Sequence, residues 1–260
     1  MHSLTQKVAL VTGVTRREGI GAAIALELAR SGADVCTAYY RPYDKAMPWG
    51  VEEAEPDAIL DALRATGVQA HGVEIDLGQP EGPRTLFSLA RQRFGRIDIL
   101  VNNAAYSTET TVEGMTAEDL DRHYAVNLRA MILLCLEYIK GFTQDGSGRI
   151  INLTSGQGLG PMPHELAYAA TKAAMIGLTK SLAREVGRLG ITVNAVAPGF
   201  LETELTADMT DEQRERVARR SALQRLADTT DVAEAVAFLV SEKGRNITGT
   251  VLTVDAGSTA

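Results

Sequence analysis

Residues 7–40 read KVALVTGVTRREGIGAAIALELARSGADVCTAYY, and this stretch decides the fold class. Its apolar ends, 7–13 and 34–40, are typical of strands, and the pattern at 20–31 is typical of a helix. A strand, a helix and a second strand in this order predict parallel neighbours in one sheet. The alternation continues, with further strands expected at 69–75, 98–102, 149–154, 192–197 and 250–254 and further helices at 57–66, 84–94, 117–140, 166–189 and 231–241.

We therefore predict an α/β fold, a Rossmann-type doubly wound parallel sheet of about seven strands flanked by helices. The chain has 260 residues, of which 45% are hydrophobic, and this suits one sizeable core. We expect a single dinucleotide-binding and catalytic domain over residues 1–260.

The composition excludes several kinds of partner. A formal net charge of -7 gives no basic footprint for nucleic acid or for a membrane surface, so a small-molecule substrate is expected. The two cysteines, Cys36 and Cys135, lie in apolar runs and are expected to be buried thiols in a reducing compartment. No signal-peptide pattern and no membrane-spanning stretch is found, so we predict a cytoplasmic protein.

Two segments interrupt the alternation of strands and helices. Residues 41–56 contain three prolines and the single tryptophan, and we expect a long loop there. Residues 201–230 are polar and charged and follow a Pro-Gly turn. Long polar excursions from an α/β domain are commonly functional lids, so we predict a substrate lid at 201–230, with solvated surface helices as the alternative.

The first strand runs into TGVTRREGIG (12–21), in which Gly13, Gly19 and Gly21 precede a helix. Glycines at such a turn let the backbone approach a pyrophosphate, which then lies at the positive N-terminus of the helix. Close packing of the helix on the strand is the alternative explanation of the same glycines. The rest of the sequence has to decide between the two.

Three more strands run into polar or glycine-rich motifs. The fourth leads into NNAAY (102–106), the fifth into TSGQG (154–158) and the sixth into APGFLET (197–203). The carboxyl ends of parallel strands lie along one edge of a sheet, where ligands bind. We therefore expect all four motifs to form one site.

One helical pattern carries YAATK, which places Tyr168 and Lys172 four residues apart on one face. Such a pair alone is more often an ordinary surface contact. However, Ser155 precedes Tyr168 by thirteen residues, and Asn127 lies in YAVNL on the preceding helical pattern. The four residues together point to a catalytic set.

These motifs, in this order and spacing, resemble the short-chain dehydrogenase/reductase family over almost the whole chain. The ending ITGTVLTVDAG (247–257) is similar to that family's last strand, and the pattern is closest to 3-oxoacyl-[acyl-carrier-protein] reductases and related ketoreductases. Two features depart from the family: five residues, instead of three, separate Gly13 from Gly19, and NNAG is replaced by NNAA. Enoyl reductases of the superfamily separate Tyr and Lys more widely, so YAATK favours a carbonyl-reducing enzyme.

The resemblance implies an NAD(P)-dependent oxidoreductase (EC 1.1.1.-) that transfers hydride between a nicotinamide cofactor and a ketone or secondary alcohol. It makes Tyr168 the general acid/base and Ser155 a hydrogen-bond donor to the substrate oxygen. Lys172 would hold the nicotinamide ribose, and Asn127 would hold a water of a proton relay. Because free tyrosine has a pKa of about 10, we expect the Lys172 cation to lower the pKa of Tyr168.

The resemblance also implies cofactor contacts from the glycine-rich turn, from the carboxyl ends of the strands and from the catalytic pair. These residues are Gly13, Thr15, Arg16, Arg17, Gly19, Ile20, Gly21, Tyr40, Arg41, Asp76, Leu77, Asn103, Ala104, Ala105, Tyr168, Lys172, Pro198, Gly199, Leu201 and Thr203. The second strand ends without an acidic residue, and Arg16, Arg17 and Arg41 are expected around the ribose. We therefore expect NADP(H) to be preferred, with NAD(H) as the alternative cofactor.

A non-catalytic dinucleotide-binding regulator is the alternative of another class, although it has no need for Ser155, Tyr168 and Lys172 together. We expect no metal, because His, Cys and carboxylate residues do not cluster at ligand spacing. His123 and His164 are expected to be ordinary surface or loop residues.

The sequence also bears on assembly and substrate. The apolar content of helices 117–140 and 166–189 predicts a homotetramer, or at least a dimer. The connection at 141–148 lacks basic residues, although Lys140 and Arg149 flank it. Because carrier proteins are typically acidic, we rank a small carbonyl compound above a carrier-protein thioester.

Overall fold

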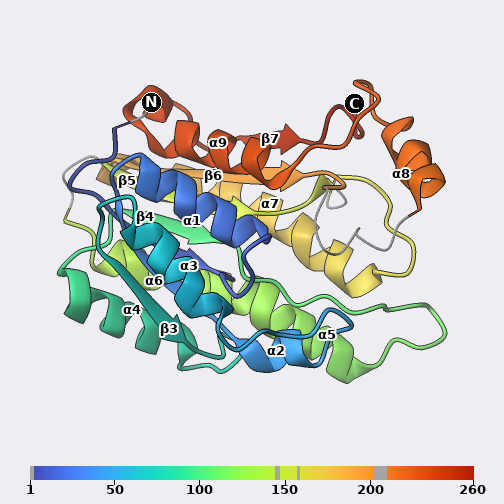
Figure 1. Ribbon diagram of the computed structural model, residues 1–260, viewed down its shortest axis with the longest axis horizontal. Coiled ribbons are helices and arrows are strands. Elements are labelled where there is room, and N and C mark those ends of the chain that lie inside the picture. Colours follow the sequence, from blue (N-terminus) through green and yellow to red (C-terminus); the bar gives the residue numbers. More distant parts are fainter. Residues whose placement is uncertain (1–2, 144–146, 157–158, 202–209) are drawn as a thin grey trace.

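The computed structural model describes residues 3–143, 147–156, 159–201 and 210–260. At its centre is a sheet of seven parallel strands in the order β3-β2-β1-β4-β5-β6-β7 (Figure 1). The strands are β1 Val8–Thr12, β2 Asp34–Tyr39, β3 Ala70–Glu74, β4 Ile99–Asn102, β5 Gly148–Leu153, β6 Ile191–Pro198 and β7 Val251–Val254. The predicted fold class is confirmed, and the strand order changes direction between β1 and β4, where open α/β sheets bind ligands.

Helices cover both faces of this sheet. On one face lie α1 (Ile20–Arg30), α3 (Glu55–Arg64) and α9 (Thr229–Val240), whose apolar residues share one core cluster with the strands. On the other face lie α4 (Gly82–Phe94), α6 (Met131–Lys140) and α7 (Leu166–Val186), which form the second cluster. Two short 3-10 turns, Gly187–Leu189 and Glu242–Gly244, follow α7 and α9. The central strands β1, β4 and β5 are therefore buried from both sides, as their unbroken apolar runs require.

Three segments differ from expectation. The expected loop at 41–56 begins with a short helix, α2 (Arg41–Lys45), which tolerates Pro42 because the first helical turn needs no N–H from it. The expected single helix at 117–140 is helical throughout but has a π-helical centre: α5 (Ala117–His123), η1 (Tyr124–Ala130) and α6. Part of the polar segment 201–230 forms α8 (Asp211–Ala218), whereas residues 202–209 lie outside the described chain.

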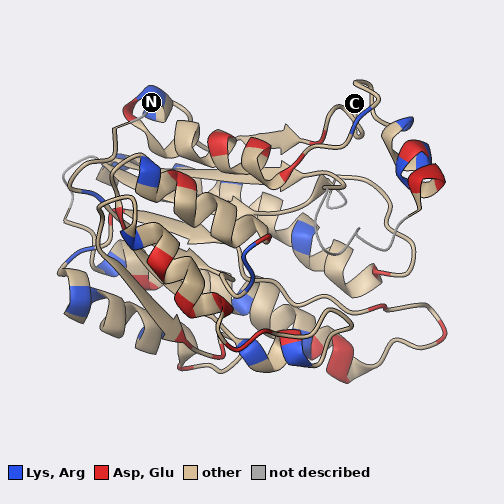
Figure 2. Cartoon of the chain, viewed as in Figure 1, with Lys and Arg blue, Asp and Glu red and all other residues tan. Residues whose placement is uncertain are grey.

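The motifs at the strand ends meet at one end of the molecule. In Figure 1 the arrowhead of β7 points toward this end, where α8 and the start of α7 lie. Acidic and basic residues are interspersed over the drawn chain, including the region of α2 and α5 (Figure 2). Every helix within the described residues is too short or too polar to span a lipid bilayer.

Candidate active site

The end of β5 and helix α7 are joined at Lys172. Its ammonium group donates to the Leu153 carbonyl oxygen over 2.7 Å, and the Thr154 hydroxyl donates to the Lys172 carbonyl oxygen over 2.9 Å. Lys172 is 2% exposed and Ser155, the next residue after Thr154, is 7% exposed. The structure thus brings the end of β5 against the helix that carries the predicted catalytic pair.

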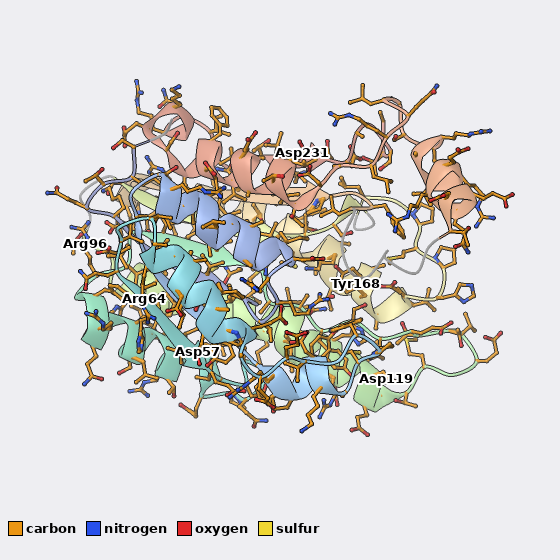
Figure 3. All side chains as sticks on the ribbon, in the orientation of Figure 1. Asp57, Arg64, Arg96, Asp119, Tyr168 and Asp231 are labelled. Atoms are coloured by element: carbon orange, nitrogen blue, oxygen red, sulfur yellow. The ribbon has the colours of Figure 1, made fainter. Side chains whose placement is uncertain are left out.

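Tyr168 lies one turn before Lys172 on α7, at the end of the molecule where the strand-end motifs meet (Figure 3). The Lys172 nitrogen lies 5.2 Å from the centroid of the Tyr168 ring. Burial raises the pKa of Tyr168, the Glu165 carboxylate and Tyr43 act in the same direction, and a side-chain hydrogen bond with Ser155 lowers it. Ser155, Tyr168 and Lys172 therefore form one contact group.

The protonation of this pair differs from the sequence-based expectation. Burial lowers the pKa of Lys172 from 10.5 to about 7. The expected net lowering of the pKa of Tyr168 is not found in this structure, because burial raises the pKa of Tyr168 and favours the neutral form of Lys172. The charged form of Lys172 has to be stabilised before it can lower the pKa of Tyr168 and make this tyrosine a stronger acid.

Asn127 lies in the π-helical turn and is 1% exposed. Its Oδ1 accepts from the Tyr106 backbone N–H over 2.7 Å, and its Nδ2 donates to the Tyr106 carbonyl oxygen over 2.8 Å and to the Thr171 hydroxyl over 3.1 Å. Asn127 therefore ties the NNAAY motif to α7, between Tyr168 and Lys172. This contact places all four predicted catalytic residues around one part of α7.

The turn between β1 and α1 brings backbone against backbone, as its glycines require. Gly13 has φ +73°, and a Cβ there would lie 2.7 Å from the Cα of Ala104. A Cβ on Gly21 would lie 2.3 Å from the carbonyl oxygen of Gly13. Helix α1 begins at Ile20 after Gly19, which has no side chain to cap the first N–H groups of the helix. Such an N-terminus suits a phosphate.

Asn103 fixes this turn from the neighbouring strand. Its Nδ2 donates to the carbonyl oxygens of Thr12 over 2.9 Å and of Gly13 over 3.0 Å. The Thr12 hydroxyl oxygen accepts hydrogen bonds from the backbone N–H groups of Asn103 and Ala104, each over 3.0 Å. The carboxyl ends of β1 and β4 are thereby locked together beside the glycine-rich turn.

A cavity of about 920 Å³ opens beside this turn, large enough for much of a dinucleotide. Seven of the predicted cofactor residues line it: Gly13, Thr15, Tyr40, Asp76, Leu77, Ala104 and Ala105. Its opposite wall comes from α5 and η1, and a third wall comes from α2 and the residues after it. The residues present therefore fit a nucleotide cofactor.

Arg41 does not face this cavity together with Tyr40. It pairs with the Glu74 carboxylate and, over 2.6 Å, with Glu53. Hydrogen bonding to Glu74 raises the pKa of Arg41, and the Arg41 guanidinium lowers the pKa of Glu74. The structure thus assigns Arg41 to an ion-pair network at the edge of β3.

The two other arginines differ in exposure. Arg16 pairs through Nε with the Asp44 carboxylate over 3.5 Å, and its guanidinium lies 4.9 Å from the ring centroid of Trp49. Arg17 is exposed, and its backbone N–H donates to Glu55 over 3.0 Å. Of Arg16 and Arg17, only Arg16 is therefore held beside a residue that lines the cavity.

The PGFLET motif continues from the end of β6. Pro198 ends the strand, and a Cβ on Gly199 would lie 2.5 Å from the Cβ of Asp255, so the chain passes tightly against the end of β7. Leu201 is buried and bridges to Ala227. Thr203, the last predicted cofactor residue, lies outside the described residues.

The two histidines behave differently. His164 is exposed, as expected. His123 is fully buried, which corrects the expectation of a surface or loop residue: its Nε2 accepts from the Thr108 backbone N–H over 3.4 Å, and its Nδ1 lies 2.7 Å from the Asp119 carbonyl oxygen. His123 is thus a packing residue whose two ring nitrogens contact backbone groups. Among the described residues, no three His, Cys, Asp or Glu side chains gather as a metal site.

Sequence reasoning missed most of the residues that line the cavity, including those of the segment after β2. Tyr43 and Asp44 line it from α2, and Trp49 packs against Tyr43 with ring centroids 6.3 Å apart. The only indication was the single tryptophan in a proline-rich segment. The positions of these side chains depend on Arg16 and on the loop after β4, and no local pattern reveals such contacts.

Comparison with known proteins gives a consistent result. Residues 13–259 match the family model described as Enoyl-(Acyl carrier protein) reductase. The oxidoreductase YjdA of Bacillus subtilis is 39% identical over 259 residues, covering 99% of this chain and 98% of that protein. A 3-oxoacyl-[acyl-carrier-protein] reductase, FabG, of Staphylococcus epidermidis is 36% identical over 251 residues, covering 96% of this chain and 98% of its own.

Solved structures agree. A short-chain dehydrogenase/reductase of Serratia marcescens superposes with a TM-score of 0.89 at 33% identity, covering 100% of both chains. A short-chain dehydrogenase of Burkholderia cenocepacia in complex with NADP gives a TM-score of 0.87 at 36% identity, covering 99% of both chains. The chain belongs to the short-chain dehydrogenase/reductase family. As a member of that family it is a nicotinamide-dependent oxidoreductase that acts on CH–OH or C=O groups.

Proposed function

We propose that this short-chain dehydrogenase/reductase reduces the carbonyl group of a small molecule with NADP(H), using Tyr168 as the general acid/base. The observation that carries the proposal is the contact group of Ser155, Tyr168 and Lys172, joined to Asn127 through Thr171. A regulator that only binds a dinucleotide has no need for this group. The cofactor supplies the hydride to the carbonyl carbon, or accepts it in the reverse direction.

The residues of the chain handle the proton. As the carbonyl carbon accepts hydride, Tyr168 gives its hydroxyl proton to the carbonyl oxygen, and the product is the neutral alcohol. The Ser155 hydroxyl donates a hydrogen bond to the same oxygen and stabilises the developing negative charge. Lys172 would hold the nicotinamide ribose and stabilises the tyrosinate that remains. Asn127 positions the backbone around Tyr106 and supports a proton relay from Lys172 to solvent.

The cofactor residues divide by role. Gly13, Gly19, Ile20 and Gly21 form the turn and helix N-terminus for the pyrophosphate, and Thr15 lies beside them. The adenosine would lie among Tyr40, Asp76, Leu77, Ala104 and Ala105, which line the cavity, and Asn103 fixes the turn. Pro198, Gly199, Leu201 and Thr203 are assigned to the nicotinamide side.

The preference for NADP(H) is supported by a related dehydrogenase in complex with NADP and by a blue fluorescent protein in complex with NADPH that is 34% identical with a TM-score of 0.87. Arg41 is held by two glutamates, so the 2′-phosphate is assigned to Arg16 and Arg17. NAD(H) remains the alternative cofactor.

For the substrate we keep a small carbonyl compound ahead of a carrier-protein thioester, although the names of several curated relatives favour the latter as a second candidate. Arg149, which flanks the connection at 141–148, is 3% exposed, and Lys140 pairs with Glu137 over 2.7 Å. Neither is well placed to attract an acidic carrier protein. Much faster reduction of an acyl carrier-protein substrate than of its small thioester analogue would reverse this order.

We further propose a single domain over residues 1–260 in which the segment 201–230 acts as a substrate lid, and a cytoplasmic homotetramer. The buried free cysteines suit a reducing compartment. The tetramer is supported by exposed apolar side chains on the helices concerned: Leu120, Tyr124 and Leu136 on the 117–140 segment and Leu166 on α7. Light scattering at micromolar concentration tests the assembly, and a monomeric mass would contradict it.

The experiment for the activity is a screen of ketones and β-ketoacyl thioesters with NADPH and NADH, followed by two variants. Tyr168→Phe removes the proton donor and keeps the ring, so turnover should fall by at least a thousandfold while dinucleotide binding is kept. Ser155→Ala should lose at least tenfold in turnover, because a donor to the developing oxyanion is lost. Turnover of Tyr168→Phe at the wild-type rate would refute the assignment.

A further inference from the structure

The segment after β2 reaches across the cofactor cavity. Helix α2 starts directly after Tyr40, and residues from α2, from the turn that follows it and from α5 line the cavity. Tyr43 spans to the loop after β4: its hydroxyl lies 3.2 Å from the backbone N–H of Ser107, which donates to it, and 3.2 Å from the Ser107 carbonyl oxygen, which accepts from it. One end of the segment is therefore fixed on the NNAAY side of the site.

The other end is fixed on the glycine-rich turn by Arg16, Asp44 and Trp49. The Asp44 Oδ1 atom accepts from the indole Nε1–H of Trp49 over 2.9 Å and pairs with the Arg16 Nε over 3.5 Å. The Arg16 guanidinium also lies 4.9 Å from the centroid of the indole ring. Its side chain is 16% exposed and that of Asp44 is 8% exposed. The guanidinium is therefore held at one edge by a carboxylate and at its face by an aromatic ring.

The location of this cluster matters for cofactor recognition. β1 and β2 are neighbours in the sheet, so the turn after β1 and the segment after β2 meet. Asp44 lines the cavity together with Thr15 and Tyr40. In dinucleotide-binding sheets the adenosine ribose is read at this place, by an acid for a free 2′-hydroxyl or by an arginine for a 2′-phosphate. Arg16 is the arginine of the glycine-rich turn that borders this place, since Glu74 and Glu53 hold Arg41, while Arg122 and Arg129 line the cavity from α5 and η1.

We propose that Asp44 and Trp49 are positioning residues for Arg16, holding its guanidinium at the adenosine end of the cavity, where it receives an adenosine 2′-phosphate. The inference rests on the proposed NADP(H) function. Asp44 balances the positive charge of the Arg16 guanidinium and keeps its N–H donors oriented. The indole ring of Trp49 keeps the plane of the guanidinium fixed. An arginine oriented in advance loses less side-chain freedom on binding, and its donors match phosphate oxygens.

The test separates the 2′-phosphate from the rest of the cofactor by using 2′,5′-ADP and 5′-AMP as calorimetric probes. Trp49→Leu removes the aromatic face, Asp44→Asn removes the charge at constant size, and Trp49→Tyr restores an aromatic ring. Arg64→Ala is the matched control, because Arg64 is an exposed arginine on α3 that pairs with Asp61. Far-UV circular dichroism checks that each variant is folded.

Trp49→Leu and Asp44→Asn should each weaken 2′,5′-ADP binding about tenfold, or about 1.4 kcal/mol. Binding of 5′-AMP should stay within about twofold, the tyrosine variant should recover most of the loss, and KM for NADPH should rise with kcat kept. In the wild-type protein, 2′,5′-ADP should change the emission of Trp49, the only tryptophan, more than 5′-AMP does.

Three outcomes would overturn the inference. Tighter binding of 2′,5′-ADP by Asp44→Asn would show that Asp44 repels the phosphate and serves the free ribose hydroxyls. Equal losses for 2′,5′-ADP and 5′-AMP would show that the cluster only supports the cavity wall. A wild-type protein that prefers 2′,5′-ADP, with variants that bind it unchanged, would remove the inference and leave the NADP(H) proposal in place. A wild-type protein without that preference would refute the NADP(H) proposal itself.

Discussion

The buried lysine of the active site gives a prediction about stability. Burial lowers the pKa of Lys172 from 10.5 to about 7, and the side chain is 2% exposed. Between these two pKa values the unfolded chain carries a proton on Lys172 that the folded chain has largely released. The unfolded state therefore binds more protons, and the free energy of unfolding rises with pH from about 7 to about 10.5. Below pH 7 both states are protonated, and this contribution no longer changes.

The magnitude follows from the two pKa values. At pH 7 the folded protein retains about half a proton on Lys172, and at pH 9 it retains almost none, whereas the unfolded chain is nearly fully protonated at both. Integration at 1.36 kcal/mol per proton and pH unit gives an increase of about 2 kcal/mol between pH 7 and pH 9.

Lys172→Met is the matched control, because methionine has a similar length and does not titrate. Urea denaturation of both proteins at pH 7 and pH 9, at one protomer concentration, isolates the contribution of the lysine from that of every other titrating group. We expect the wild-type protein to gain about 2 kcal/mol relative to the variant. Parallel pH dependences would refute the reasoning and would show that Lys172 stays charged in the folded protein.

Three further outcomes are expected. Asn127→Ala removes two hydrogen bonds to Tyr106 and one to Thr171 and should lower the free energy of unfolding by about 2–3 kcal/mol, at about 1 kcal/mol per bond; a loss under about 0.5 kcal/mol in urea denaturation would contradict this. Gly21→Ala places a Cβ 2.3 Å from the Gly13 carbonyl oxygen and should weaken dinucleotide binding at least tenfold by calorimetry, whereas Gly177→Ala, with open space around its Cβ, should bind normally. Burial raises the pKa values of Cys36 and Cys135 to about 12, so native protein at pH 8 should not react with a thiol reagent, and rapid labelling before unfolding would count against this.

The fold could be predicted because its determinants are local. Strand β1 (Val8–Thr12) is buried along its whole length, and its sequence is an unbroken apolar run that ends in a threonine and a glycine. The proximity of Tyr168 and Lys172 could be predicted for a similar reason. Tyr168 and Lys172 lie four residues apart on one helix, so the helical repeat alone places them on the same side.

The π-helical turn at Tyr124–Ala130 could not be predicted. YAVNL continues the helical pattern, and nothing in its spacing marks a change of hydrogen bonding. The partners of Asn127 are Tyr106 and Thr171, which lie 21 and 44 residues away in sequence. A local sequence pattern cannot predict a turn that is stabilised by such long-range contacts. π-Helical turns are nevertheless frequent at functional sites.

The ion-pair partners of the arginines could not be predicted from the sequence either. Arg41 was expected at the 2′-phosphate because of its position after β2. Instead it forms an ion pair with Glu74, which lies 33 residues away on the neighbouring strand β3. Arg16 was expected from its place in the glycine-rich turn, and its partner Asp44 comes from the segment expected as an unstructured loop. Charge pairing depends on which strands are neighbours, and this is known only once the sheet order is known.

The protonation of Tyr168 and Lys172 likewise depends on contacts that only the folded structure reveals. In this structure burial favours neutral Tyr168 and lowers the pKa of Lys172 to about 7, so neither group alone is suited to carry charge. Two opposite unit charges about 5 Å apart attract one another by about 3 kcal/mol at an effective dielectric constant of about 20, and this is the order expected between a tyrosinate and the neighbouring Lys172 cation. The attraction is reciprocal: it favours the ammonium of Lys172 as much as it favours the tyrosinate. In the proposed mechanism Tyr168 gives its proton to the substrate oxygen. Lys172 then becomes a better proton acceptor, and loss of one proton is coupled to uptake of the next.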